Sequence, residues 1–290
     1  MSASATETSI ALPRAVGRAE VEFKRRGDET VLASLYQQGS AKVRFPAVDQ
    51  GDLPQAVLLN TSGGLTDGDR YLVKGCWRSG TRAILTTQAA ERIYRSRGDV
   101  AVVDFELHIG SEATAVFLPQ ETIVFDGGRC ARNTAIHVDA NAHLLVMDAL
   151  VLGRHAMDEV VRTGRWLDYW QIYRDGRLSL TDRFALESAD DDLTNLIANP
   201  TVLGGRAAVA TGFAMTDADP GLQARVVDAL ASCDVFGGAS LVGHVVCWRM
   251  VADDGNALRR ASNQLFDAIT SKAPKESPFA AMRLPRVFSC

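Results

Sequence analysis

Cysteine is scarce in this sequence, and its spacing excludes the usual roles of paired cysteines. The 290 residues include only five, Cys76, Cys130, Cys233, Cys247 and Cys290, and no two form a C-x-x-C pair. An odd number of widely spaced cysteines supports neither a disulfide framework nor a zinc ribbon. We therefore expect reduced thiols, as in the cytoplasm.

Strong net charge and long apolar runs are also missing. The formal charge is −4 at pH 7, which gives no electrostatic footprint for nucleic acid or an anionic membrane. No apolar run approaches the roughly 20 residues that cross a bilayer. The small, polar N-terminal residues lack the apolar core of a signal peptide. These absences predict a soluble, cytoplasmic protein that binds neither nucleic acid nor membranes.

Sequence signatures of common catalytic and metal sites are absent. The loop NTSGGLTDGD at 60–69 has Asp69 after its last glycine, where a phosphate-binding loop would have lysine. The histidines form no H-E-x-x-H motif, and no G-x-S-x-G elbow occurs. Distant residues can still converge in a fold, so a β-rich metal-dependent hydrolase remains the alternative to a protein without catalytic activity.

Alternation of apolar and polar residues predicts many short strands. In AVVDFELHI at 101–109 every second residue is apolar, and similar patterns cover 113–118, 133–139 and 143–152. The stretch 166–186 predicts a hairpin, with Asp175-Gly176 as its tight turn. Such a chain indicates a sandwich, a barrel or a β-solenoid, and the sequence shows no repeat of fixed length.

Two stretches near the C-terminus have apolar residues at helical spacing instead. They are 220–232, which begins with proline, and 255–271, and they predict two helices that make the mainly β fold α+β. The remaining tail, 272–290, is apolar and basic without periodicity. It predicts either packing on its own domain or a partner surface.

Several acidic residues lie in strand-rich, half-buried contexts. They are Asp104, Glu106, Glu121, Asp126 and Asp148. One interpretation makes them solvent-facing partners of arginines. The other makes them the lining of a polar passage for a cation, since carboxylate oxygens bind a divalent ion loosely enough to release it.

Four long motifs in a fixed order carry a family resemblance. They are NTSGGLTDGD at 60–69, TTQAAERIYRS at 86–96, LPQETIVFDGGRC at 118–130 and DALVLGRHAMDE at 148–159. RDGRL at 174–178 and LGG at 203–205 follow. The series resembles the urease accessory protein family UreD, also called UreH, over roughly residues 15 to 290.

The resemblance implies an irregular, β-helix-like winding of many short strands, with two α-helices near the C-terminus. It also implies one domain over 16–290 behind a disordered tail at 1–15. Family members are scaffolds without their own catalytic activity. They act on apo-urease with UreF and with the GTPase UreG, and they help to place nickel in the urease active site.

The resemblance also directs attention to particular residues, and the lack of soft or imidazole-rich ligand clusters limits the expected cofactor. The motif residues expected to be structural or to contact partners are Asn60, Gly63, Gly64, Gly68, Asp69, Thr87, Gln88, Tyr94, Arg95, Gln120, Gly153 and Arg154. We expect no tightly bound cofactor and at most weak or transient nickel, with the five acids above as candidates for its passage. Glycines permit backbone angles closed to other residues, so the 60–69 loop is expected to be a shaped corner.

Overall fold

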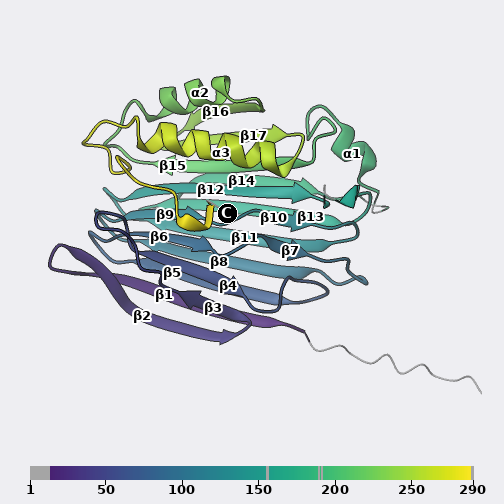
Figure 1. Cartoon of the computed structure of the whole chain (residues 1–290), viewed down its shortest axis with the longest axis horizontal. Helices are drawn as coiled ribbons and strands as arrows, with labels where there is room; N and C mark the ends of the chain where they lie inside the picture. Colours follow the sequence, from purple (N-terminus) through teal and green to yellow (C-terminus); the bar gives the residue numbers. More distant parts are fainter. Residues whose placement is uncertain (1–13, 155–156, 189, 191, 289–290) are drawn as a thin grey trace, which may run out of the picture.

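The strands of this chain form two large sheets that stack face to face (Figure 1). The computed structural model describes residues 14–154, 157–188, 190 and 192–288. Sheet A contains, in spatial order, β14 (Arg177–Leu186), β13 (Arg165–Arg174), β11 (Arg129–Val138), β8 (Ala101–Ile109), β5 (Arg70–Trp77), β1 (Val16–Arg26) and β2 (Glu29–Gly39). Sheet B contains β16 (Phe236–Val242), β17 (Val245–Ala252), β15 (Ala208–Met215), β12 (His143–Leu152), β9 (Thr114–Leu118), β6 (Arg82–Thr87), β4 (Gln55–Asn60) and β3 (Ala41–Arg44).

The chain winds between the two sheets as a solenoid. Strands β5, β8, β11 and β13 pair in parallel in sheet A, and β4, β6, β9 and β12 pair in parallel in sheet B. Short strands β7 (Glu91–Ile93) and β10 (Thr122–Val124) pair at one side. The expected β-helix-like winding is confirmed. One row of paired residues across β5, β8, β11 and β13 is Leu72, Asp104, Asn133 and Tyr169. The spacing between these residues in the sequence is unequal, so the coils differ in length. The sequence therefore shows no repeat of fixed length.

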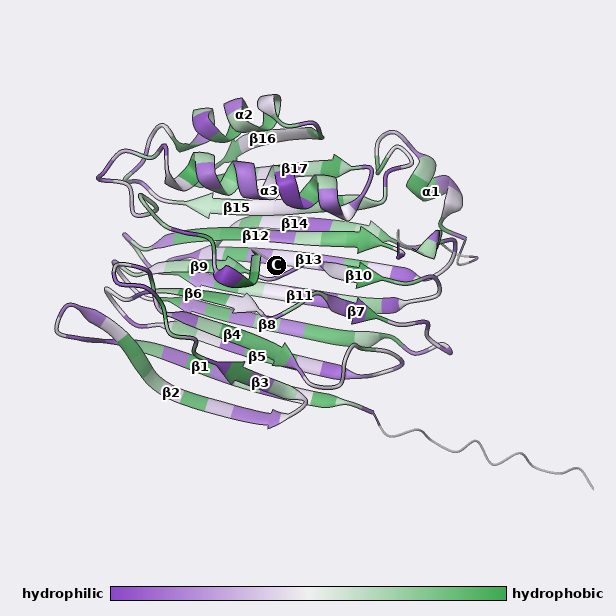
Figure 2. Ribbon diagram, in the orientation of Figure 1, coloured by the Kyte–Doolittle hydropathy of each residue, from purple (hydrophilic) through white to green (hydrophobic). Residues whose placement is uncertain are grey.

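Two apolar layers hold the sheets and helices together. The larger layer lies between the sheets and contains Trp77, Phe117 and Trp166. The second lies on the outer face of sheet B, under helices α2 (Leu222–Ser232) and α3 (Gly255–Thr270). Both helices were predicted, and Figure 2 shows the polar and apolar stripes of α3. The short helix α1 (Thr194–Ala198) was not predicted, because five residues are too few to show a helical period.

Other local predictions can be compared with the structure. The 166–186 hairpin is confirmed, with positive φ at both Asp175 and Gly176. The four cysteines within the described ranges are free, whereas Cys290 lies outside those ranges. Most of the 1–15 stretch lies outside them too, so its predicted disorder stays a prediction, as does the single domain. No helix in the described ranges is both long enough and apolar enough to span a membrane.

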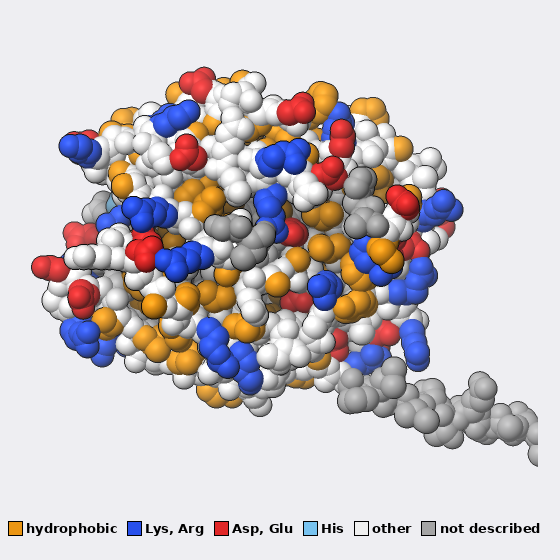
Figure 3. Space-filling view, in the orientation of Figure 1, with side chains coloured by type: hydrophobic (Ala, Val, Ile, Leu, Met, Phe, Trp, Pro, Cys, Tyr) orange, Lys and Arg blue, Asp and Glu red, His pale blue; other side chains and the backbone are white. Residues whose placement is uncertain are grey.

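The C-terminal segment packs on its own domain. Phe279 and Met282 are buried in the layer under α3, and the carbonyl of Pro278 accepts a hydrogen bond of 2.9 Å from Arg82 of β6. The segment then crosses sheet B and ends in the short 3₁₀ helix η2 (Arg286–Phe288) (Figure 1). On this face, charges of both signs are interspersed (Figure 3).

Candidate functional site

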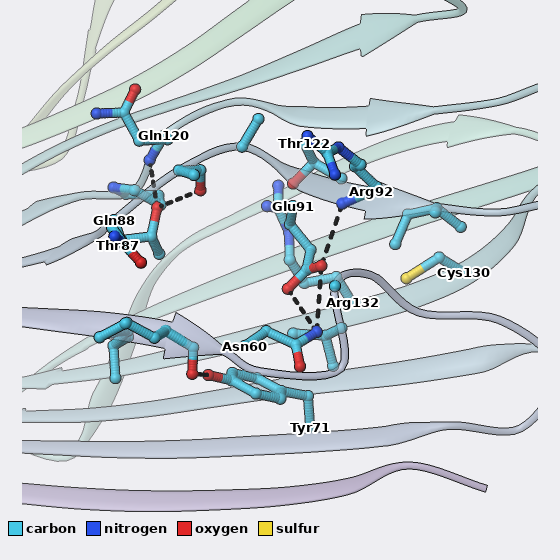
Figure 4. A pocket seen from close by; sticks show the side chains of 18 of the residues that line it. Asn60, Tyr71, Thr87, Gln88, Glu91, Arg92, Gln120, Thr122, Cys130 and Arg132 are labelled. Carbon is cyan, nitrogen blue, oxygen red and sulfur yellow. Dashed lines mark hydrogen bonds between the residues drawn. The ribbon is translucent and has the colours of Figure 1, made fainter. Parts of the chain in front are cut away.

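One pocket leads from the surface into the space between the two sheets. It opens where the end of β4, the loop from β6 to β7 and the link from β9 to β10 meet, and it has a volume of about 170 Å³. Its floor is formed by side chains of sheet A, among them Tyr71, Cys130, Arg132 and Trp166. We call it the interior pocket (Figure 4).

A half-buried carboxylate and an amide face each other at the mouth of the interior pocket. The Asn60 Nδ2 donates hydrogen bonds of 3.2 and 3.1 Å to the two oxygens of Glu91 (Figure 4). Burial raises the pKa of Glu91, against the opposing effect of this hydrogen bond. The hydroxyl of Tyr71 donates to the carbonyl of Leu59 at 3.2 Å. The mouth is therefore polar, and the carboxylate of Glu91 lies beside the cationic Arg92.

The opposite rim of the mouth is joined to the C-terminal segment. The backbone N–H of Gln120 donates to Thr87 Oγ1 at 2.8 Å, beside the exposed Gln88. The Gln120 side chain donates to the carbonyl of Val287 at 3.0 Å and accepts a hydrogen bond from Arg259 of α3 at 3.2 Å. These contacts place the end of the described chain next to the pocket.

Beneath the pocket lies a buried ionic cluster of Arg132, Asp148 and Asp168, which we call the interior triad. The Arg132 guanidinium donates to both oxygens of Asp148, at 2.9 and 2.5 Å, and to both oxygens of Asp168, at 2.9 and 2.6 Å. Each of the three residues is only 5% exposed. Trp166 and Trp170 flank the guanidinium, and the Trp170 indole donates to Asp168 at 3.0 Å.

The interior triad carries one excess negative charge if both carboxylates are ionised. Burial and the neighbouring Asp168 raise the pKa of Asp148, while Arg132 lowers it. Burial also raises the pKa of the adjacent Cys130 thiol to about 12, so that this thiol is neutral. An uncompensated buried charge is costly, and proteins retain one where it binds a cation or a proton.

The glycine loop is a hydrogen-bonded corner beside the mouth. The Asn60 Oδ1 accepts from the backbone N–H of Ser62 at 3.1 Å. Asp69 accepts from the backbone N–H groups of Thr66 and Ala15 at 2.9 and 2.7 Å. Gly63, Gly64 and Gly68 all have positive φ. The Tyr94 hydroxyl donates to the carbonyl of Gly63 at 3.2 Å, which holds the ring against the loop.

Gly64→Ala is expected to destabilise the protein by about 2–3 kcal/mol, because Gly64 has φ of +147° and an added Cβ would lie 2.3 Å from the Tyr94 ring. Gly63→Ala is the matched control: its φ is +78° and nothing lies within 4 Å of an added Cβ. It should cost about 1–2 kcal/mol from backbone strain alone. Urea denaturation compares the two, and an equal cost would deny the contact with Tyr94.

The remaining motif residues gather next to the loop. Tyr94 packs edge-on against Phe125 at 5.1 Å, and the guanidinium of Arg154 lies 4.6 Å above the same ring. Arg95 pairs with Asp126. Gly153 has φ of +74°, and an added Cβ would lie 2.5 Å from the carbonyl of Glu159. The motifs thus form two adjacent groups, one at the mouth and one around Phe125.

The five candidate acids do not form one cluster. Asp104 and Glu106 lie on the outer face of sheet A, where they contact Asn133 and Lys74. Glu121 pairs with Arg259 at 2.7 Å. Asp126 accepts from the backbone N–H groups of 162 and 163, both at 2.9 Å. Only Asp148 belongs to the interior triad.

Sequence reasoning missed Glu91, Arg132 and Asp168. A signal existed for Asp168, because strand alternation in WLDYWQIY places it on the same face as Trp166 and Trp170. Arg132 likewise shares the inward face of β11 with Cys130. Within the described ranges, no group of three His, Cys, Asp or Glu side chains is preformed around a metal position.

The fold and the pocket define a β-solenoid protein with a charged interior, and sequence comparison adds its family. The sequence model described as "UreD urease accessory protein" matches residues 15–285. A protein of Chelativorans sp. (strain BNC1) named urease accessory protein UreD is 39% identical over 86% of this chain and 88% of its own length. Proteins of the same name from Methylobacterium sp. (strain 4-46) and Rhizobium leguminosarum bv. viciae are 37% and 36% identical, each over 90% of this chain and over 90% and 93% of their own lengths.

These matches place the chain among accessory proteins of urease. It belongs to the UreD family. A role in urease maturation and in assembly of its metallocentre follows from this membership, as does interaction with the urease machinery.

Proposed function

We propose that this chain is a non-catalytic scaffold that assembles on apo-urease in the cytoplasm with UreF and UreG. In this complex it promotes the GTP-dependent insertion of nickel into the urease active site. Family membership supports the role in maturation. The observation that carries the nickel step is the interior pocket, which joins the surface to the interior triad.

Nickel is the cargo in this proposal, and the chain holds it only in passing. Glu91 lines the cavity at its mouth, and Arg132 lines its floor, paired with Asp148 and Asp168 behind it. Carboxylate oxygens alone bind a divalent ion such as Ni²⁺ more weakly than imidazole or thiolate does, which suits release. The excess charge of the triad offsets part of the cost of taking a cation out of water.

The alternative is a β-rich metal-dependent hydrolase whose site is assembled from distant residues. Such an enzyme should contain metal when purified alone and should turn over a substrate. A scaffold should show no turnover and should co-purify with its protein partners. Family membership favours the scaffold.

Urease activity in cells tests the proposal directly. Cells that receive nickel and the urease operon, with or without this gene, are compared for urease activity and for accumulated apo-urease. Activity should vanish without the gene while apo-urease still accumulates. Full activity in its absence would reject the scaffold.

A further inference from the structure

We propose that the free edge of β14 binds an extended, acidic segment of a partner protein as an added strand of sheet A. Within the described ranges β14, the last strand of sheet A, pairs with β13 alone, so its other edge carries unpaired backbone groups. An exposed edge of this kind is a template for a further strand. The surface lies outside the interior pocket and does not rest on the nickel passage proposed above.

Sheet B extends past this edge and provides a floor for the added strand (Figure 1). Trp170 of β13 packs on Phe213 of β15 at 5.3 Å, and Asp182 of β14 pairs with Arg249 of β17 at 2.5 Å. β16 follows β17 in sheet B, and every residue of β16 except Ala239 is exposed. A strand added about 4.8 Å from β14 would therefore lie over the inner face of β17 and β16.

A shallow groove runs beside the free edge of β14. It has a volume of about 210 Å³, and its lining includes Asp182 of β14, Gly238 and Ser240 of β16 and Cys247 of β17. Gly238 and Ser240 pair with Arg249 and Cys247, which lie on the inner face of sheet B, so they belong to that face too. Nothing lies within 4 Å of a Cβ added to Gly238. The groove is therefore open to the side chains of an added strand.

Exposed apolar side chains flank the groove at the two ends of β16. Phe236 is 66% exposed and Val242 is 45% exposed. They pair with Val251 and Val245 of β17 and so lie on the same inner face. Because covering them removes apolar surface from water, they favour apolar side chains at the inward positions of the bound segment.

The outward side chains of β14 favour acidic neighbours. Arg183 is exposed, and the residue opposite it on β13 is Tyr169, so no carboxylate faces it across the strand pair. Arg177 adds a second exposed guanidinium at the start of the strand, whereas the charge of Asp182 is offset by Arg249. Opposite charges on adjacent strands attract and like charges repel. Carboxylates at the outward positions of the segment would therefore stabilise its binding.

The geometry favours a peptide segment over a second copy of the chain. In an antiparallel pair of β14 edges, the two copies of sheet B would lie on the same side, where the projecting β17 and β16 of each copy would collide. The register shift between Leu178 and Leu180 confines regular pairing to Leu180–Leu186. This stretch has the length of an ordinary short strand.

A fluorescent peptide in which valine alternates with glutamate tests this surface on the full, purified chain. Its valines can face the groove while its glutamates face outward. Fluorescence anisotropy should show saturable binding, and a peptide with lysine in place of glutamate should bind about tenfold more weakly. Gly238→Trp, which fills the groove, and Arg183→Glu, which reverses the charge, should each weaken binding about tenfold.

Two variants at exposed positions away from the groove are the matched controls. Asn133→Trp adds the same indole on the outer face of sheet A, and Arg260→Glu makes the same charge change on α3. Both should leave binding unchanged. Circular dichroism checks that each variant is folded.

Hydrogen exchange locates the bound peptide. Binding should slow the exchange of β14 amides and leave β2, at the opposite edge of sheet A, unchanged. Lack of binding by the unaltered chain, equal binding of the lysine peptide, or binding undiminished in both Gly238→Trp and Arg183→Glu would overturn the proposal. A dimer of the unaltered chain that Gly238→Trp dissociates would also overturn it, because the edge would then belong to a second copy.

Discussion

Arg132→Met is expected to destabilise the fold by about 3–5 kcal/mol, because it leaves Asp148 and Asp168 buried without a cation. Methionine is close to arginine in length and can occupy the space between Trp166 and Trp170. The loss is therefore electrostatic in origin more than a loss of packing. Urea denaturation of the purified chain measures it as a lower midpoint at an unchanged slope.

Two comparisons separate the charge effect from other causes. Arg26→Met removes an exposed arginine that pairs with Glu29 at 3.6 Å, and should cost less than about 1 kcal/mol. Adding Asp148→Asn and Asp168→Asn to Arg132→Met should restore part of the stability, because no buried carboxylate remains. If the triple variant were as unstable as Arg132→Met, the contacts of the arginine with the tryptophans would explain the loss instead.

The cost of Arg132→Met should also depend on pH. Burial raises the pKa of Asp148, and without the guanidinium of Arg132 nothing opposes this effect, so its folded-state pKa lies above its unfolded value. The folded variant then binds more protons than the unfolded chain, so its stability falls as pH rises through the folded pKa values. The difference from the parent protein should be largest near about pH 8 and should shrink toward about pH 5. A difference that grows on acidification would contradict unpaired carboxylates.

Local patterns predicted strands β8, β9, β11 and β12, the β13–β14 hairpin and both long helices. In β8 each inward residue is apolar, and the observed burial alternates as the sequence indicates. In α3 the apolar residues Leu258, Ala261, Leu265 and Ile269 are all buried. The alternation of apolar and polar residues was compatible with a sandwich, a barrel or a solenoid, because the pairing of strands is a long-range property. Only the family motifs pointed to the winding.

Which residues meet in the candidate site depends on the long-range register of the strands more than on local sequence patterns. The interior triad is built from three strands, which contribute Arg132, Asp148 and Asp168. The sequence around each of these residues does not indicate that the other two are its partners. By contrast, the contacts of Asn60 and Asp69 within the glycine loop are local, so their residue types alone indicated a hydrogen-bonded corner.

Replacing one acid of the interior triad is expected to lower urease activation while leaving the fold intact. Asp168→Asn removes the excess negative charge but leaves Arg132 paired with both oxygens of Asp148. The fold and its partner contacts should therefore survive. If nickel crosses this interior, urease activation should fall roughly tenfold, the scale expected when a metal-contacting group is altered. Urease activity in cells producing the variant measures it.

Asp104→Asn is the matched control, since Asp104 lies on the outer face of sheet A, where its contact is Asn133. It should leave activation unchanged, while co-purification with UreF, UreG and apo-urease should match the parent protein for both variants. Equal loss in both variants would deny the interior any special role. Loss of partners with Asp168→Asn would make the triad a structural support of the interface. Only a selective loss, with the complex intact, supports a cation inside the solenoid, because Asp168 is 5% exposed and is connected to the interior pocket through Arg132.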